Sequence, residues 1–96
     1  MKILYYTNYS ITEPKECLGV IKIIESNERK KTHGLLGNRE GYYRKNGEWI
    51  RDDWKAYDKA FGENLDWFEA DEKEAKKAIR ELDEAWRRRQ KNLEKE

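Results

Sequence analysis

The spacing of apolar and polar side chains changes several times along the chain, and each change marks a predicted element. The first residues, Lys2 to Tyr9, form a short run dense in tyrosine and aliphatic side chains. Such side chains favour β-strands, and no helical spacing fits a segment that begins this early. The run therefore predicts a first strand, and its apolar side chains on both faces indicate an interior position in a sheet.

Residues 13–26 fit two different patterns. Thr12-Glu13-Pro14 is typical of a helix start, because it offers a capping hydroxyl, an acid for the first turn and a proline where no N–H is needed. Polar residues then recur every three or four positions as far as Arg29, so an amphipathic helix ending near Gly34 is the favoured prediction. The alternative is a strand over residues 19–25, which has the higher strand propensity.

The sharpest local signal lies in residues 41–51. Asn46-Gly47 stands between two aromatic-rich runs and is the preferred two-residue hairpin turn, because both turn positions need a positive φ. Alternation divides the strand side chains between the two faces of the sheet, and one face receives Tyr42, Arg44, Trp49 and Arg51.

Two shorter elements are predicted between the hairpin and the last helix. Asp53 can cap a short helix from Trp54 to Phe61, and Gly62 ends it. The aromatic side chains of that helix fall on one edge, at Trp54, Tyr57 and Phe61. Residues 65–70 have the composition of a short fourth strand, and Asp71 is the expected cap of the helix that follows.

The final helix, from Glu72 to about Asn92, keeps a helical spacing throughout. An apolar seam runs along it, formed by Ala75, Ile79, Leu82, Trp86 and Leu93. Opposite charges four positions apart, such as Asp83 with Arg87, favour the helical state, whereas the highly charged residues 90–96 are expected to fray. Together the elements predict one α+β domain over residues 1–96, with a small antiparallel sheet packed by helices.

Charge is unevenly distributed along the chain. Charged residues make up 43% of the sequence, which leans toward disorder, but four Trp, six Tyr and two Phe supply apolar area for one core. The net charge is only +1, yet residues 29–51 carry seven bases against two acids, and residues 63–74 carry six acids against one base. This separation predicts two surface patches of opposite sign.

Motifs for catalysis and metal binding are missing from the sequence. One Cys and one His cannot build a zinc site, and no phosphate-binding loop, dinucleotide fingerprint or serine nucleophile elbow occurs. Cys17 and His33 are a conceivable nucleophile and base, but packing on an apolar face explains Cys17 and a helix C-terminus explains His33. Helix capping likewise accounts for Asp53 and Asp71 without a role in metal binding. The sequence therefore predicts no enzyme, no metal site and no cofactor.

Candidate contact residues come from three places in the chain. The hairpin face combines aromatic rings with guanidinium groups, in Tyr42, Arg44, Trp49 and Arg51. Such a surface suits a protein hot spot or the stacking of bases, and packing beneath a helix is the structural alternative. Arg89 interrupts the apolar seam and is expected at a contact with a partner or with a second copy in a homodimer. In the acidic segment the candidates are Glu69 and Glu72.

In size, charge content and lack of catalytic motifs the chain resembles small phage-encoded anti-CRISPR and other anti-defence inhibitors. The resemblance extends over the whole chain but is anchored in no residue motif, so it assigns no functional residue. It implies a non-enzymatic binding protein that inhibits a larger host protein, such as a nucleic-acid-processing defence effector. The alternative is a nucleic-acid-binding accessory protein that uses the basic segment 29–51. The single Cys, with no signal peptide and no long apolar run, predicts a cytoplasmic location and no membrane contact.

Overall fold

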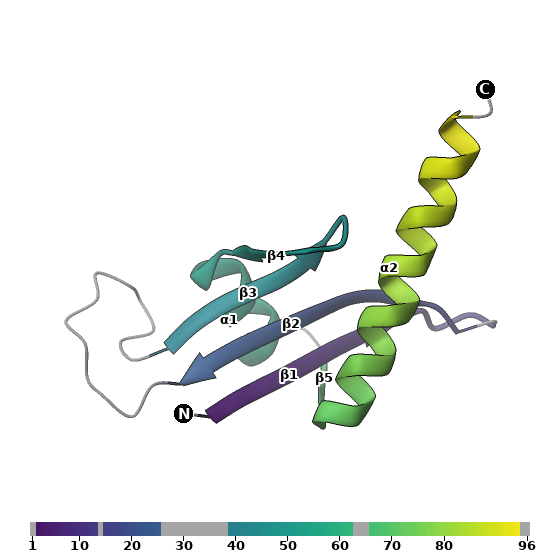
Figure 1. Ribbon diagram of the computed structural model, residues 1–96. Coiled ribbons are helices and arrows are strands. Elements are labelled where there is room, and N and C mark those ends of the chain that lie inside the picture. The colour runs from purple at the N-terminus through teal and green to yellow at the C-terminus, as the bar shows by residue number, and fades with distance from the viewer. Residues whose placement is uncertain (1, 14, 26–38, 63–65, 95–96) are drawn as a thin grey trace.

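The computed structural model describes residues 2–13, 15–25, 39–62 and 66–94. Within these ranges five strands form one antiparallel sheet in the order β4-β3-β2-β1-β5, and two helices pack against it (Figure 1). Along the chain the elements are β1 (Lys2–Tyr9), β2 (Cys17–Glu25), β3 (Arg39–Lys45), β4 (Glu48–Arg51), α1 (Asp53–Phe61), β5 (Phe68–Ala70) and α2 (Glu72–Glu94). The predicted α+β class, with its antiparallel sheet and long C-terminal helix, is confirmed.

The largest departure from the sequence prediction concerns residues 13–26. The favoured helix is wrong, because the segment contains β2, which is the strand alternative and the middle strand of the sheet. Alternate side chains of β2 enter different layers, so that Val20 packs toward α2 whereas Ile21 and Ile23 pack toward α1. The β-branched side chains decide the outcome, because a strand between two helices buries both faces and an amphipathic helix buries only one.

Two other predicted features of the sheet are confirmed. β1 lies between β2 and β5, which makes it an interior strand as expected. Asn46 and Gly47 form the turn between β3 and β4, with φ angles of 52° and 76°. The register pairs Arg44 with Trp49 and Tyr42 with Arg51, so these four side chains share one face of the sheet.

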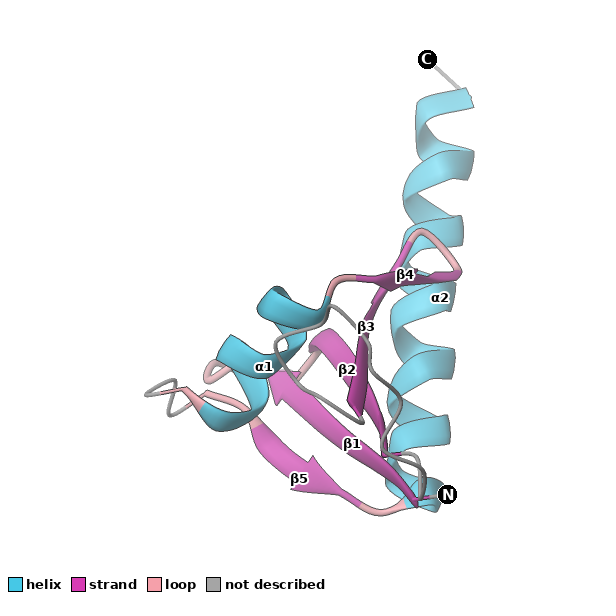
Figure 2. Ribbon diagram, turned by 90° about the vertical axis from the view of Figure 1, so that its left-hand side faces the viewer, coloured by secondary structure: helices cyan, strands magenta, loops and turns pink. Residues whose placement is uncertain are grey.

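The two helices cover opposite faces of the sheet, as Figure 2 shows. Ala56 of α1 packs into a buried cluster with Ile21 and Ile23. Ala78 of α2 packs into a second cluster with Val20, on the other face. Both helices therefore meet the sheet through alanine, which lets the helix backbone approach the strands closely.

The start of α1 differs in detail from the prediction. Asp52, not Asp53, is the N-cap, and its side chain accepts a hydrogen bond from the backbone N–H of Lys55 at 3.0 Å. Asp53 lies in the first turn and accepts from the backbone N–H of Gly41 at 2.9 Å, which ties α1 to β3. A methyl group on Gly41 would lie 2.5 Å from the Cβ of Ala56, so glycine is required where α1 crosses this strand.

β5 and α2 complete the fold. The strand predicted over residues 65–70 is confirmed at Phe68–Ala70, and residues 63–65 lie outside the described ranges. Asp71 caps α2 as expected and accepts from the backbone N–H of Glu74 at 2.7 Å. The helix continues to Glu94, so residues 90–94, for which the sequence predicts fraying, are helical.

Candidate functional site

The C-terminal half of α2 extends beyond the sheet (Figure 1). At its start the apolar seam is covered by the sheet, because Ala75 and the neighbouring Ala78 are fully buried. Leu82 and Trp86 are partly exposed, and Leu93 is 64% exposed. The seam thus continues past the surface that the described strands can cover.

A β-bulge brings a second apolar side chain to this part of α2. On β1, the neighbours Asn8 and Tyr9 pair with Gly19 and Cys17, which leaves Leu18 of β2 as the extra residue. Bulges commonly redirect a side chain, and they occur often beside functional sites. Leu18 is 58% exposed, a large fraction for a leucine next to an amphipathic helix.

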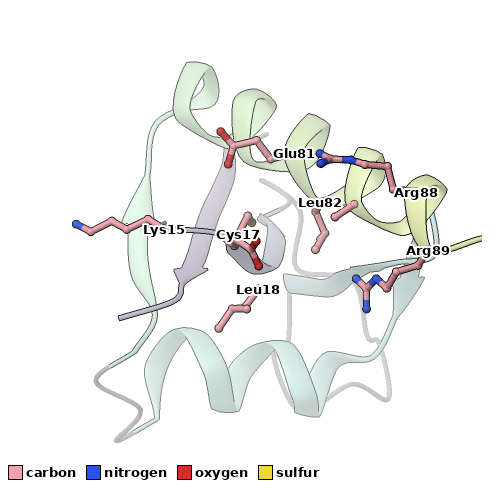
Figure 3. A pocket seen from close by; sticks show the side chains of 9 residues that line it. Lys15, Cys17, Leu18, Glu81, Leu82, Arg88 and Arg89 are labelled. Carbon is pink, nitrogen blue, oxygen red and sulfur yellow. The ribbon is translucent and has the colours of Figure 1, made fainter. Parts of the chain in front are cut away.

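Leu18 and the C-terminal half of α2 border an open hollow, which we call the α2 groove. Figure 3 shows its first part, of ≈ 650 Å³, with Cys17 and Leu18 from β2 on one side and Leu82 and Arg89 from α2 on the other. A second part, of ≈ 410 Å³, runs past the β3–β4 turn to Leu93. Leu18, Leu82 and Arg89 line both parts, so the groove follows α2 from Leu82 to Leu93.

Basic side chains surround the α2 groove. Residues 85–93 hold no acid and four bases, namely Arg87, Arg88, Arg89 and Lys91. Arg88 and Arg89 line the groove, with Lys15 on the β2 side. The acids that line it are Glu16 and Glu81 in the first part and, in the second part, Asp83, which is paired with Arg44. Among the ion pairs within the described ranges, none involves Lys15, Arg88 or Arg89. Three cations at the groove are therefore available to an incoming carboxylate.

The structure places Arg44, a candidate contact residue, in an internal ion pair. Its guanidinium donates two hydrogen bonds to Asp83 of α2, from Nε to Oδ1 at 3.1 Å and from Nη2 to Oδ2 at 2.8 Å. The two side chains are only 16% and 15% exposed. The predicted side-chain pair between Asp83 and Arg87 is wrong for this reason, and Arg87 Nε donates instead to the Asp83 backbone carbonyl at 3.4 Å. The Arg44 charge is neutralised within the fold.

Trp49 and Tyr42, on the same hairpin face, also make internal contacts. Trp49 packs against the buried cluster beneath α2, which was the structural alternative for this residue. Lys22 of β2 places its Nζ 4.3 Å from the Trp49 ring centre and 5.1 Å from that of Tyr42. Burial, and then the nearby Arg44 guanidinium, lower the pKa of Lys22. The face is a layer of aromatic rings interleaved with cations.

Arg51 lies at the outer end of this face and is paired with acids. Its guanidinium contacts the carboxylates of Asp53 at 3.3 Å and Glu40 at 3.6 Å. Burial alone would raise the pKa of Asp53, but hydrogen bonds from Arg51 and from the Gly41 N–H lower it overall. Glu40 also accepts a hydrogen bond from the Tyr42 hydroxyl at 2.7 Å. Both arginines of the hairpin face therefore have carboxylate partners in the same molecule.

The acidic candidates stand apart from the basic ones. Glu69 is exposed on the edge strand β5, and Glu72 is exposed in the first turn of α2, where it pairs with Lys76 at 3.2 Å. About 25 Å of helix separates Glu72 from Arg89. Acids at the start of α2 and bases at its end also suit the helix dipole, which accounts for part of the charge separation along the chain.

An aromatic edge of α1 faces outward. The sequence predicts this edge, and the structure turns its Trp54 end away from the sheet, because Ala56 and Ala60 occupy the inner side of the helix. At the other end, the Phe61 ring contacts the ring of Tyr6 in β1, with the ring centres 5.9 Å apart. Trp54 is 65% exposed, and Tyr57 and Phe61 are 40% and 41% exposed. This edge lies on the opposite side of the sheet from the α2 groove, so substitutions in it serve as controls for substitutions in the groove.

Within the described ranges, Tyr9 and Glu81 lie near Cys17, and burial raises the pKa of the Tyr9 hydroxyl to about 12. Cys17 is buried, and burial raises the pKa of its thiol to about 11, so the thiol is protonated at neutral pH. His33, the base considered for it, and residues 29–38 of the basic segment lie outside the described ranges. Within those ranges no three His, Cys, Asp or Glu side chains are placed to hold a metal ion. No helix in the described part of the chain combines the length and apolar character needed to cross a membrane.

Sequence reasoning missed Leu18 because the favoured prediction assigned residues 13–26 to an amphipathic helix. The available signal was Gly19, since an isolated glycine in a strand-like run marks a bulge or a close approach. Both apply here. The bulge immediately precedes Gly19, and the Trp67 ring lies over Gly19, so that a methyl group on Gly19 would be 2.7 Å from Cη2 of Trp67.

Comparison of the chain with protein-family models, with curated proteins and with solved structures finds no match. A functional proposal for this chain therefore rests on the geometry of the described residues.

Proposed function

We propose that this protein is a non-enzymatic binding protein that captures a larger protein through the α2 groove. The observation that carries the proposal is the apolar seam that continues beyond the sheet, with Leu93 and Leu18 both well exposed along one groove. Exposed apolar surface with a polar rim is typical of protein interaction sites. Trp86 and Arg89 belong to residue types enriched at the energetic centres of such sites.

The resemblance to small anti-defence inhibitors extends this proposal to a biological effect. It implies that the captured protein is a host effector that processes nucleic acid and that capture inhibits it. A groove that holds one element of such an effector would act by blocking movement or access, and no reacting group is required of the inhibitor.

Direct nucleic-acid binding through the hairpin is less well supported. Phosphate contacts need free cations, and Arg44 and Arg51 are each paired with carboxylates within the protein. Stacking of bases needs accessible rings, and Trp49 packs beneath α2. The side chains of Arg44, Trp49 and Arg51 therefore make their contacts within the protein itself.

The test compares capture by three forms of the tagged protein in lysate from the cells that contain it. Leu93→Lys places a charge in the groove seam, and Trp54→Lys is the matched control, since Trp54 and Leu93 have nearly the same exposed fraction, 65% and 64%. We expect the wild type and Trp54→Lys to retain the same protein after nuclease treatment and Leu93→Lys to lose it.

Loss of the captured protein on nuclease treatment would contradict the proposal in favour of nucleic-acid binding. Loss with Trp54→Lys and retention with Leu93→Lys would move the binding surface to α1. If the captured protein is a nuclease or another nucleic-acid-processing enzyme, adding the purified small protein should lower its activity, and unchanged activity would exclude inhibition.

A further inference from the structure

We infer that the occupant of the α2 groove is an amphipathic helix with an acidic polar face, presented by the larger protein. The inference rests on the proposed function and specifies its partner. Three properties of the groove support it, namely its shape, its lining and its charge.

The groove has the dimensions of a helix-binding site. It follows α2 from Leu82 to Leu93, which corresponds to about 16 Å of helix axis. A partner helix of about eleven residues, or three turns, matches this length. Leu18 stands opposite α2, so an apolar strip on the partner helix would contact Leu18 on one side and Leu82 and Leu93 on the other.

Arg89 gives the groove its preference for acid. It occupies a seam position and is exposed, and Figure 3 shows it directed into the hollow from α2. Its aliphatic stem can pack beside the leucines while its planar guanidinium accepts a carboxylate on two hydrogen bonds. Arg88 and Lys15 line the same hollow, and no described carboxylate pairs with any of the three.

A second copy of this chain fits the groove poorly. Pairing two C-terminal halves of α2 would bring the four bases of residues 85–93 in one copy against the same four in the other, with no acid between them. Juxtaposed like charges are costly at an interface. The same bases favour a partner helix that carries Asp and Glu on its polar face.

A nucleic acid also fits the groove poorly. Phosphates would satisfy the arginines, but the sugar-phosphate backbone offers nothing to cover Leu18, Leu82 and Leu93. A helix with leucines on one face and glutamates on the other satisfies both requirements.

The test uses synthetic peptides of three turns as probes. The first carries Leu at helical spacing and Glu elsewhere, the second replaces each Glu by Lys, and the third keeps the composition of the first with the leucines scrambled. Each is titrated into isotope-labelled full-length protein and followed by amide chemical shifts, with a short DNA duplex as a fourth probe. We expect the first peptide to bind at least about ten-fold more tightly than any other probe. The shifts should centre on Leu18, Leu82, Arg89 and Leu93.

Variants give the inference its specificity. Arg89→Gln keeps the polarity of the side chain but removes its charge, and we expect it to weaken the acidic peptide about ten-fold. Leu18→Ser should weaken the peptide by a similar factor, whereas Trp54→Ser should leave its affinity unchanged. Arg89→Lys, which keeps the charge without the planar fork, should recover only part of the affinity.

Equal binding of the acidic and basic peptides, shifts confined to other surfaces, or tighter binding of the duplex would each overturn the inference. So would a dimer in light scattering that Leu93→Lys dissociates, since the occupant would then be a second copy. If no peptide binds but Leu93→Lys still loses the protein captured from lysate, the proposed binding function stands and only the acidic helix is refuted. Failure of both experiments would refute the proposed function as well.

Discussion

The Arg44–Asp83 pair is expected to be a main tie between the hairpin and α2. Replacing Arg44 by Met keeps the aliphatic stem and removes the guanidinium, so Asp83 is left 15% exposed without its bidentate partner. Exposed ion pairs contribute about 0–1 kcal/mol, and breaking a buried pair costs about 3–5 kcal/mol. The exposed fractions of 16% and 15% place this pair nearer the buried case, so Arg44→Met should lower the free energy of unfolding by about 2–3 kcal/mol. The melting temperature should fall by about 10–20 °C.

A double-mutant cycle measures the pair itself. The wild type, Arg44→Met, Asp83→Asn and the double variant are unfolded in urea and followed by tryptophan fluorescence. The second substitution removes a group that the first has already left without a partner. The double variant should therefore lose less free energy of unfolding than the two single variants lose together. The expected coupling is about 2 kcal/mol. A coupling below about 0.5 kcal/mol would show that the bidentate contact contributes no more than an exposed pair and would refute this reasoning.

The internal role of Arg44 makes it a poor probe of partner contacts. Reversing its charge would place two carboxylates together beneath α2 and damage the fold first. Arg89 is exposed and pairs with no described carboxylate, so its variants report on binding with less effect on stability.

Four further predictions concern other positions. Gly41→Ala should lower the unfolding free energy by about 1–3 kcal/mol in thermal melts, because the added methyl overlaps the Cβ of Ala56, and wild-type melting would mean that α1 shifts freely. Gly47→Val should cost at least about 1–2 kcal/mol because of the positive φ, and an unchanged hairpin by NMR with full stability would disprove that turn. Leu93→Lys should change the unfolding free energy by less than about 0.5 kcal/mol, and a larger loss would mean that the seam end is packed. Burial of Cys17 predicts no reaction with a thiol reagent at about pH 8 in the native state. Stability should be full below the ordinary thiol pKa of 9.0 and fall as pH rises toward about 11, because the unfolded thiol ionises first, and rapid native labelling would contradict this.

Local chemistry accounts for the elements that the sequence alone predicts. The Asn46-Gly47 turn needs two positive φ angles, which few residue pairs supply, so its position and the register of β3 and β4 follow from two residues. The cap at Asp71 and the regular apolar spacing of α2 are likewise contained within a few turns of chain. These features depend on neighbours in sequence, and the structure confirms them.

Tertiary structure decided everything that depends on which element packs against which. Residues 17–25 satisfy a helical spacing and a strand propensity at once, and the choice falls to the strand because β1, β3 and both helices together bury two faces. The partner of Asp83 changes from Arg87, four residues away, to Arg44, thirty-nine residues away, because the sheet holds Arg44 in bidentate geometry. The α2 groove forms where a bulge turns Leu18 outward beside a helix that extends beyond the sheet. The local sequence of a helix does not determine how far the sheet beneath it extends, so the groove could not be predicted from the sequence.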